Sequence, residues 1–321
     1  MNLIDIQKVF KTDDECMEHL SRLRWPDGVR CVTCGTDKVA QYSSPSKKQP
    51  NRKIYQCQEP TCKEQFTATA GTIFHDTHLP LTKWFMALEL IADAKKGISA
   101  LQLQRNLHVG YKTAWYLAHR IRKAMEETGG EPLTGTVEID ETYVGGKSIR
   151  KSNRGNRRYE MKDAVVGMVE RGGRLRFRYI GKGSATADRV RPVVLQNVSR
   201  DVDRVITDES MIYPRVFDGY CASKHETVCH QSEYVHGSDT HTNTIESAFS
   251  LLKRGIMGNF HQVSIKHLSR YLSEFEYRFN RRQQKGLPST DIFKETLARM
   301  VRVKPMPFVA LTGKQATTEP F

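Results

Sequence analysis

Polar and apolar residues alternate along the segment TVEIDETYVGGK (136–147), with the period of a half-buried β-strand. Val137 and Ile139 supply the apolar face, and Asp140 follows at the expected end of the strand. The pair Gly145-Gly146 predicts a turn soon afterwards. Because a carboxylate on a central strand is costly to bury unless it is paired or bound to a metal, the segment predicts a site at Asp140.

Further apolar runs predict the rest of a mixed sheet. Three strands joined by hairpins, then a helix, then a strand form the order of a ribonuclease-H-like fold. In that topology the first and fourth strands are neighbours, so Asp140 and Asp208 are expected side by side. The strands after the first are expected over residues 164–169, 174–180 and 204–207, and the helix over 185–197.

Helical periodicity predicts the elements outside the sheet. Thr12 and Glu15 form a capping-box pattern at the start of one helix. In a helix capped by residues 242–244, Glu246 and Lys253 share a face that differs from the apolar one. Three more helices are expected within 79–125 and a long one from 265, whereas the tail from Val303 has no periodicity and is expected to be loose.

Four of the seven cysteines form two closely spaced pairs, Cys31 with Cys34 and Cys57 with Cys62. Two such pairs joined by a loop are the layout of a zinc ribbon, in which four thiolates close a tetrahedral site. Four sulfur ligands leave no open coordination position, so the expected Zn²⁺ is structural. The alternative is that these cysteines bind no metal.

Two helices across a tight turn at Val109-Gly110 fit a helix-turn-helix, and the second helix is rich in lysine and arginine. Lys112, Thr113 and Tyr116 are then expected to face a groove of DNA. Helix pairs of this shape also occur as plain scaffolding, and the pattern alone leaves both interpretations open.

The net charge of +14 and the pI near 9.5 indicate a polyanionic partner, most simply double-stranded DNA. The segment KSIRKSNRGNRR (147–158) contains six basic residues and no acidic ones. It is predicted to close on a nucleic-acid backbone, and an ordinary flexible loop is the alternative. The residues proposed to contact phosphate are Arg150, Arg154, Arg157 and Arg158.

Other features of composition restrict the class of protein. No run approaches 18 apolar residues, so no membrane-spanning segment is expected. The N-terminal residues lack a basic start followed by an apolar core, so no secretion signal is visible. The cysteine spacings suit metal and a reducing compartment better than disulfides, which leads us to expect a cytoplasmic protein.

Asp140, Asp208 and Glu246, expected on strand, strand and helix, form a set that holds divalent cations for phosphoryl transfer. Two-metal transfer needs carboxylates that bridge the ions, and Mg²⁺ prefers such oxygen ligands. Single acidic residues are common, and other candidates lie nearby. Asp239 competes with Glu246, and the competitors of Asp208 are Asp201, Asp203 and Glu209.

The chain also resembles the DDE-type transposases of bacterial insertion sequences, in the branch with an N-terminal zinc ribbon (the insertion-sequence family numbered fifteen-ninety-five). The likeness extends from about Trp25 to Arg282. Phe249 and Val32 depart from the family pattern, where tryptophan and proline look commoner. The matching motifs are RWPDGVRCVTCG, QFTATAGTIFHDT, KKGISALQLQRNL, VEIDETYVGGK, TNTIESAFSLLKRGIMGNFH and YLSEFEYRFNRR.

This resemblance implies a ribonuclease-H-like core that cuts the ends of an element and joins them to target DNA with Mg²⁺, for which Mn²⁺ substitutes. By position, Asp140, Asp208 and Glu246 match the catalytic residues of that family. Lys253, seven residues after Glu246, matches a basic position of the branch. A homo-oligomer assembled on DNA is expected.

The chain is therefore expected to be multidomain. Two other functions remain open: a DNA-binding regulator with a catalytically silent third domain, and a nuclease of the same fold that cuts without joining. The expected domains are an N-terminal helix with a zinc ribbon (1–75), a helix-turn-helix (76–130), an α/β ribonuclease-H-like catalytic domain (131–300) and a tail (301–321).

Overall fold

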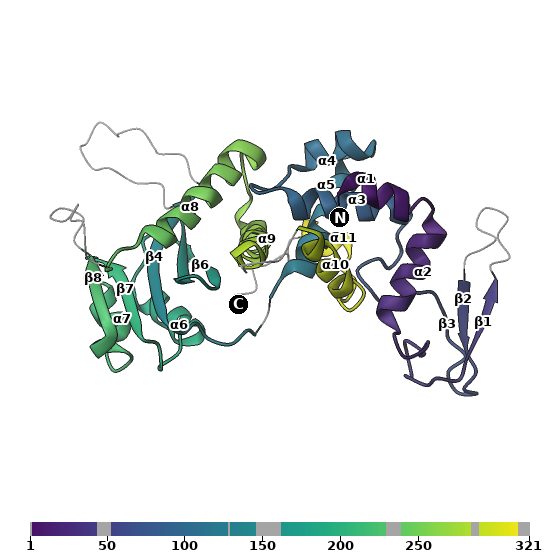
Figure 1. Cartoon of the computed structure of the whole chain (residues 1–321), viewed down its shortest axis with the longest axis horizontal. Helices are drawn as coiled ribbons and strands as arrows, with labels where there is room; N and C mark the ends of the chain where they lie inside the picture. The colour runs from purple at the N-terminus through teal and green to yellow at the C-terminus, as the bar shows by residue number, and fades with distance from the viewer. Residues whose placement is uncertain are drawn as a thin grey trace. The chain divides into compact units, whose positions relative to one another are not determined.

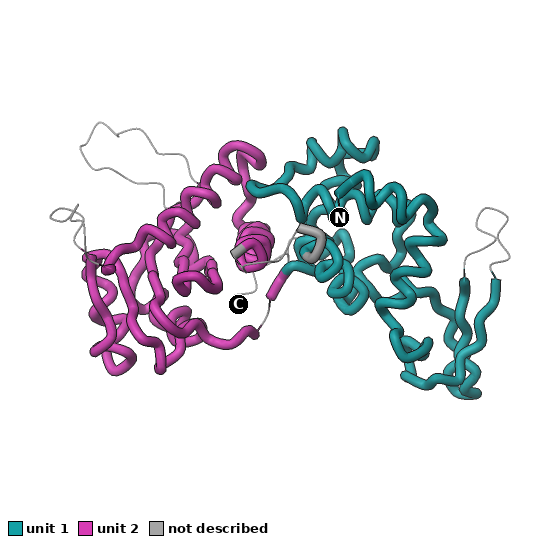
Figure 2. The backbone as a smooth tube through the Cα atoms, in the orientation of Figure 1, with its two compact units in different colours: residues 1–125, 287–313 teal, residues 126–286, 314–321 magenta. Residues whose placement is uncertain are grey.

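The computed structural model describes residues 2–43, 53–127, 129–145, 162–228, 239–283 and 289–313. These residues form two compact units, shown in different colours in Figure 2. Unit 1 contains the described residues up to 125 together with 289–313, and unit 2 contains those from 126 to 283. Residues 289–300 therefore lie with the N-terminal unit, whereas the sequence pattern assigned them to the catalytic domain.

Unit 1 begins with two helices and a small antiparallel sheet. The capping box predicted at Thr12 and Glu15 is present at the start of the second helix. Trp25, Tyr55 and Phe66 pack edge-on or stacked against one another and form the core of the sheet. The elements are α1 (Leu3–Val9), α2 (Asp13–Arg24), β1 (Val39–Ser43), β2 (Lys53–Cys57) and β3 (Gln65–Phe66).

The remainder of unit 1 is helical. Ser99 caps α4, and a left-handed residue, His108, ends it before the next helix starts. One face of α5 is buried, with Ala114, Ala118, Ile121 and Met125 in the core. The elements are α3 (Leu81–Asp93), α4 (Ala100–Leu107), α5 (Tyr111–Met125), α10 (Ser289–Met300) and α11 (Phe308–Thr312).

The segment after residue 300 packs on unit 1 as far as it is described, so the expectation of a loose tail from Val303 is wrong for residues 303–313. Met306 and Leu311 are buried, and Phe308 packs edge-on against Tyr116. The short helix α11 was not predicted, because Pro305 and Pro307 precede it and suggested an irregular tail. Pro307 is the N-cap of α11 and so lies outside its helical turns.

The sheet of unit 2 has the strand order β6-β5-β4-β7-β8. The predicted mixed sheet is confirmed, since β4 pairs antiparallel with β5 and parallel with β7. The first and fourth strands of the unit are thus neighbours. The strands are β4 (Thr136–Val144), β5 (Asp163–Glu170), β6 (Leu175–Lys182), β7 (Arg204–Asp208) and β8 (His225–Val228).

Helices cover both faces of this sheet (Figure 1). One apolar cluster joins Val137 and Ile139 of β4 to the helices α6 and α7. The other joins β5 and β6 to the helices α8 and α9. The bounds are α6 (Ala187–Asn197), α7 (Tyr213–Phe217), η1 (Ala222–Lys224), α8 (Asn243–Gly255), η2 (Ile256–Phe260) and α9 (Ile265–Gln283). No helix in the described ranges combines the length and apolar character that crossing a membrane requires.

Helix α9 supplies hydrogen-bond partners for the outer strand β6. Asn280 both accepts from the backbone N–H of Leu175 and donates to its carbonyl. Glu276 accepts from the N–H of Phe177 and pairs with arginines of the same strand. These side chains replace a neighbouring strand, because an outer strand otherwise leaves its backbone groups unpaired.

Helix α8 lies unusually close to the sheet at Gly167 of β5. A Cβ atom at this position would lie 2.7 Å from both Ile245 Cδ1 and Phe249 Cζ. Gly167 is also the residue that pairs with Asp140 across the β4–β5 ladder. The absence of a side chain at Gly167 therefore sets the distance between α8 and the strand that carries Asp140.

We expect Gly167→Ala to lower the free energy of unfolding by about 1–3 kcal/mol, because the added methyl group overfills this contact. Chemical denaturation of the purified variant measures the change. Gly258→Ala is the control, since nothing lies within 4 Å of the added Cβ, and its stability should stay within about 0.5 kcal/mol of the parent. Equal stability of the two variants would contradict this account of the contact.

Candidate active site and zinc-binding site

Asp140 lies in the middle of β4, four residues before its end, and not at the end of the strand as the sequence suggested. The strand continues past Asp140 to Val144, directly before Gly145, because these residues also pair with β5. Asp140 and Glu138 share the face that lies toward α8. Val137 and Ile139 lie on the other face, whereas Val144 at the end of the strand belongs to the apolar cluster that includes α8.

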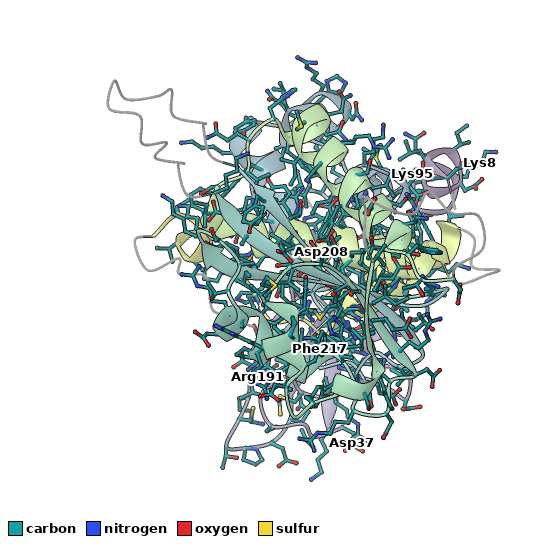
Figure 3. The ribbon with its side chains drawn as sticks, turned by 90° about the vertical axis from the view of Figure 1, so that its left-hand side faces the viewer. Lys8, Asp37, Lys95, Arg191, Asp208 and Phe217 are labelled. Carbon is teal, nitrogen blue, oxygen red and sulfur yellow. The ribbon has the colours of Figure 1, made fainter. Side chains whose placement is uncertain are left out.

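Asp208 ends β7 directly beside this position. The parallel ladder pairs Glu138 with Ile206, so two residues further along the two strands Asp140 stands opposite Asp208. The backbone N–H of Ser210 donates to Asp208 Oδ1 at 3.0 Å and fixes the carboxylate. Asp208 is labelled in Figure 3. The prediction that the two aspartates are neighbours is therefore supported by the register.

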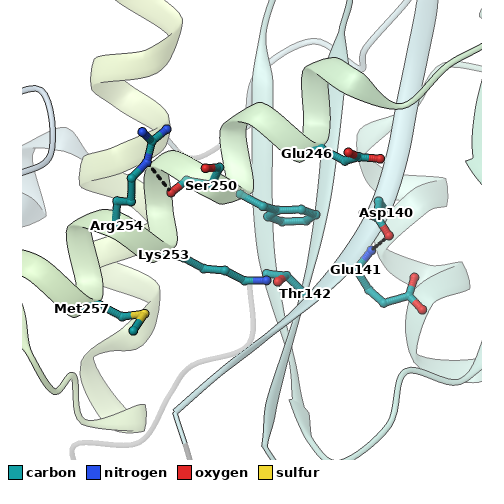
Figure 4. A pocket seen from close by; sticks show the side chains of 9 residues that line it. Asp140, Glu141, Thr142, Glu246, Ser250, Lys253, Arg254 and Met257 are labelled. Carbon is teal, nitrogen blue, oxygen red and sulfur yellow. Dashed lines mark hydrogen bonds between the residues drawn. The ribbon is translucent and has the colours of Figure 1, made fainter. Parts of the chain in front are cut away.

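Glu246 reaches the same region from the first turn of α8. Figure 4 shows its carboxylate pointing toward Asp140, with Glu141 on the far side. Thr242 donates to Glu246 Oε1 at 2.9 Å. Ile245 and Phe249 of the helix face the core, as predicted, which turns Glu246 to the surface. Carboxylates from two strands and one helix thus gather at one place.

The cap of α8 differs from the expected one. Thr242 occupies the N-cap position, but its side chain makes no capping hydrogen bond. Instead the fully buried carboxylate of Glu138 accepts from the backbone N–H groups of Thr244 and Ile245 at 2.8 and 3.0 Å. Sequence reasoning missed Glu138, because a cap from a strand more than 100 residues away leaves no local signal.

Burial and nearby charge disfavour the ionised form of Asp140. Burial raises the pKa of Asp140 to about 7, and the neighbouring carboxylates act in the same direction. The backbone N–H of Glu141, which donates to Asp140 Oδ1 at 2.7 Å, lowers the pKa against this trend. The carboxylates that raise it are Glu141, Asp208 and Glu246.

Glu141 is a further carboxylate of the site that sequence reasoning did not single out. Its Oε2 accepts from the hydroxyl of Tyr213 at 2.6 Å. Burial is the main cause that raises the pKa of Glu141, and the charge of Asp208 adds to it. The available signal for Glu141 was its position directly after Asp140, as the second of two consecutive acidic residues. The period of a strand places the two side chains on opposite faces.

A pocket of about 380 Å³ opens between these carboxylates and the middle of α8. Asp140 and Glu246 line one end, and Lys253 and Arg254 line the other (Figure 4). Phe249 and Met257 contribute apolar surface, and Arg254 donates to the carbonyl of Ser250. The predicted grouping of Glu246 with Lys253 on one helix face is confirmed. The arrangement places two cationic side chains, those of Lys253 and Arg254, in the same pocket as three carboxylates.

The competing acidic residues are placed elsewhere. Asp239 pairs with Arg171 at 2.9 Å and with Arg204 at 3.1 Å, so its carboxylate already has two cationic partners. Asp201, Asp203 and Glu209 are exposed and do not line the pocket.

The carboxylates of the pocket fit a divalent cation by their chemistry. They are oxygen donors of the kind that Mg²⁺ prefers, and their mutual repulsion, seen in the raised pKa of Asp140, is what a bound cation relieves. Their oxygens are not brought together as tightly as ligands around an ion. Among the residues that the structure describes, the four cysteines alone form a metal-type group within 4.8 Å.

The four cysteines of unit 1 have the geometry of a structural zinc site. Cys31 Sγ lies 3.7 Å from Cys62 Sγ, and Cys34 Sγ lies 3.5 Å from Cys57 Sγ. Tetrahedral zinc with a Zn–S distance of about 2.3 Å sets its sulfurs about 3.8 Å apart. The cluster therefore fits Zn²⁺, with no ligand position left for substrate.

The proposed DNA-contacting residues fall into three groups. Lys112 and Thr113 are exposed in the first turn of α5. Tyr116 is partly buried: its hydroxyl donates to the carbonyl of Met306, and Arg120 lies over its ring. These contacts leave Tyr116 less exposed than Lys112 and Thr113, and its contact with DNA stays a prediction. Arg150, Arg154, Arg157 and Arg158 lie outside the described residues.

Two regions of the chain match families of transposase domains. Residues 132–280 match the ISXO2-like transposase domain, and residues 11–65 match the transposase zinc-ribbon domain. The chain is also 30% identical over 283 residues to the "Uncharacterized protein in transposable element ISH50" of Halobacterium salinarum (strain ATCC 700922 / JCM 11081 / NRC-1). That match covers 84% of this chain and 92% of the relative.

Among solved structures, the crystal structure of a pre-cleavage Mos1 transpososome matches 66% of this chain and 77% of that chain. The sequence identity is 13% and the TM-score is 0.26. At this TM-score the similarity supports no conclusion about the fold or function of this chain.

We expect about one zinc ion per chain in the purified protein, because four thiolates at these distances close a tetrahedral site. Cys57→Ser should lose the zinc and with it the folding free energy that the site contributes. Elemental analysis combined with thermal unfolding measures both. Cys221→Ser is the control, since Cys221 lies outside the cluster and should keep the metal. Folded parent protein without zinc would contradict the assignment.

Proposed function

Because the chain belongs to the ISXO2-like transposase family, we propose that it binds the ends of an insertion sequence, cleaves DNA strands there and joins them to target DNA. The observation that carries the chemistry is the gathering of Asp140, Asp208 and Glu246 from two strands and one helix beside a pocket that also contains Lys253. The order of these elements matches a ribonuclease-H-like core.

Asp140, Asp208 and Glu246 would hold the divalent cations. A bound Mg²⁺ would supply activation of the attacking oxygen and stabilisation of the leaving oxygen in phosphodiester cleavage. Each of the three residues would contribute a negative oxygen ligand, and the charges of both Asp208 and Glu246 act on Asp140. Mn²⁺ offers the same ligand preference and is expected to substitute.

Lys253 supports the reaction from the opposite end of the pocket. It lies on the same exposed face of α8 as Glu246, two turns further along the helix. An ammonium group there faces the negative charge that develops on the phosphoryl oxygens in the transition state. We propose that Lys253 orients the scissile phosphate and stabilises this charge.

Recognition of the element's ends is assigned to unit 1 and to the basic segment. The helices α4 and α5, joined by a tight turn, have the succession of a helix-turn-helix, and Lys112 and Thr113 are exposed where a recognition helix meets base edges. The arginines of 147–158 would contact phosphates without reading sequence. Cutting and joining two ends requires more than one active site, so we expect a homo-oligomer on DNA.

Two other functions are compatible with parts of this site. A nuclease of the same fold would share the carboxylates and cut without joining. A regulator would keep the DNA-binding parts and have no need for the carboxylates. The pocket favours an enzyme, because a silent domain has no requirement for buried neighbouring carboxylates such as Asp140 and Glu141, whose pKa values are raised by burial and further by nearby acidic charges.

We expect Asp140→Asn, Asp208→Asn and Glu246→Gln each to lower cleavage and strand transfer on the order of 100-fold or more, because each removes a charged ligand. Lys253→Ala should cause a smaller loss, since it removes no ligand. Cleavage and joining of labelled end DNA in Mg²⁺ measure both steps. The matched control is Glu209→Gln, next to Asp208 but exposed outside the pocket, which should cleave like the parent. Near-normal activity of Glu246→Gln would remove Glu246 from the site.

We expect the basic segment and α5 to contribute different kinds of DNA affinity. Replacing Arg154, Arg157 and Arg158 with glutamine should reduce the slope of log affinity against log salt by about 3, because roughly one counterion is released per phosphate contact. Sequence preference should remain. Replacing Lys112 and Thr113 with alanine should reduce discrimination between end DNA and unrelated DNA. Titrations at several salt concentrations measure both, and equal losses on all DNA in both variants would contradict this division.

A further inference from the structure

We propose that Glu138 is a positioning residue, which holds the start of α8 against β4 and thereby fixes Glu246 on the side of the sheet that carries Asp140, where the two carboxylates would bind the same divalent cation. Glu138 would not itself bind the cation. This inference rests on the proposed function, since it assigns Glu246 and Asp140 to the same cation site. It goes beyond that function because Glu138 is not one of the proposed cation ligands and acts through its hydrogen bonds to α8.

The carboxylate of Glu138 is attached to the first turn of α8 at three points. Oε2 accepts from the N–H groups of Thr244 and Ile245, and Oε1 accepts from the hydroxyl of Thr244 at 2.9 Å. Glu246 is the next residue along the chain. The first N–H groups of a helix have no partner within it, and its N-terminus favours an anion. Glu138 therefore meets both requirements from outside the helix.

The same strand carries Asp140 two residues further on. Two residues of a β-strand span roughly 7 Å, and both side chains lie on the face toward α8. A local N-cap would attach the helix only to its own loop. A cap that comes from β4 instead ties the position of Glu246 directly to the strand that carries Asp140.

The Glu138 carboxylate has little freedom to move. It is fully buried, and Arg171 Nε donates to its Oε1 at 2.7 Å. The same guanidinium donates to the carbonyl groups of Asp239 and His241, in the segment that leads into α8. Arg171 thus links Glu138 to the residues that precede α8. The segment before the helix and the first turn of the helix are therefore both attached to Glu138.

The position of Glu246 matters because Mg²⁺ tolerates little variation in the distances and angles of its oxygen ligands. Mg²⁺ demands oxygens at about 2.0–2.1 Å in near-octahedral geometry. Partners that orient metal ligands typically change metal affinity by about 10–100-fold when they are mutated. A shift in the first turn of α8 would move Glu246, whereas Asp140 and Asp208 would stay on the sheet.

The test measures Mn²⁺ affinity of the full-length protein by electron paramagnetic resonance, which needs neither DNA nor turnover. Glu138→Gln keeps the shape of the side chain but turns one acceptor into a donor that opposes the N–H groups of α8 or Arg171. We expect it to weaken Mn²⁺ binding about tenfold or more. Glu138→Asp, which keeps the charge but has a shorter reach, should show a smaller loss and serves if Glu138→Gln does not fold.

The matched control is Glu276→Gln. Glu276 is also a buried carboxylate that pairs with arginines and accepts from a backbone N–H, but these partners lie on β6 and none of them belongs to the first turn of α8. This variant should lose stability and keep the Mn²⁺ affinity of the parent. A general effect of removing a buried carboxylate would instead weaken Mn²⁺ binding in both variants and would overturn the proposal.

The double variant decides whether Glu138 acts through Glu246. If it does, adding Glu138→Gln to Glu246→Gln should cause no further loss of Mn²⁺ affinity, because the residue that it positions is already removed. Additive losses would overturn the proposal, and so would unchanged affinity in Glu138→Gln while Glu246→Gln loses the ion. If Glu246→Gln itself keeps the parent's affinity, both this proposal and the assignment of Glu246 in the proposed function fail.

Discussion

The contact between α8 and the central strands is the constraint on which the candidate site depends. Asp140 and Asp208 are set side by side by the parallel pairing of β4 with β7, but Glu246 arrives on a separate element. Gly167 allows the helix to approach the sheet, and Glu138 holds its first turn. Without these two contacts the third carboxylate would have no fixed relation to the first two.

That arrangement brings like charges together, which opposes folding unless something compensates. The chain compensates with hydrogen bonds and cationic partners around the site: a backbone N–H at Asp140, a tyrosine hydroxyl at Glu141 and a guanidinium at Glu138. Burial still raises the pKa of Asp140 to about 7, and the neighbouring carboxylates add to this effect. A cluster of buried, neighbouring carboxylates is suited to bind cations, because a bound ion reduces the repulsion between their negative charges.

The two units divide the work that a transposase must perform. Unit 1 contains a four-cysteine cluster and a bundle in which α10 and α11 return from the far end of the sequence to pack with α3 and α5. Unit 2 contains the sheet and the carboxylates. Because the chain leaves unit 1 and later returns to it, the sheet of unit 2 is inserted in the sequence between two parts of one compact unit.

The sequence by itself determined the parts of this protein whose signals are local. Period two and short apolar runs predicted the strands β4 to β7 of unit 2, although β8 was not predicted. Cysteine spacing predicted the zinc-type cluster, and the motifs around Asp140 and Glu246 pointed to the family. Helical periodicity along α8 also separated its core face from the face with Glu246 and Lys253. These features depend on neighbours within a few residues, so they can be recognised in one chain.

Only the tertiary structure decided the contacts between residues far apart in the sequence. It showed that Glu138, and not Thr242, satisfies the N–H groups of α8, and that Tyr116 contacts Met306. It also removed Asp239 as a candidate, because two arginines from different parts of the sheet bind its carboxylate. Partners separated by 35 to 190 residues leave no periodic pattern, since their proximity is a result of folding.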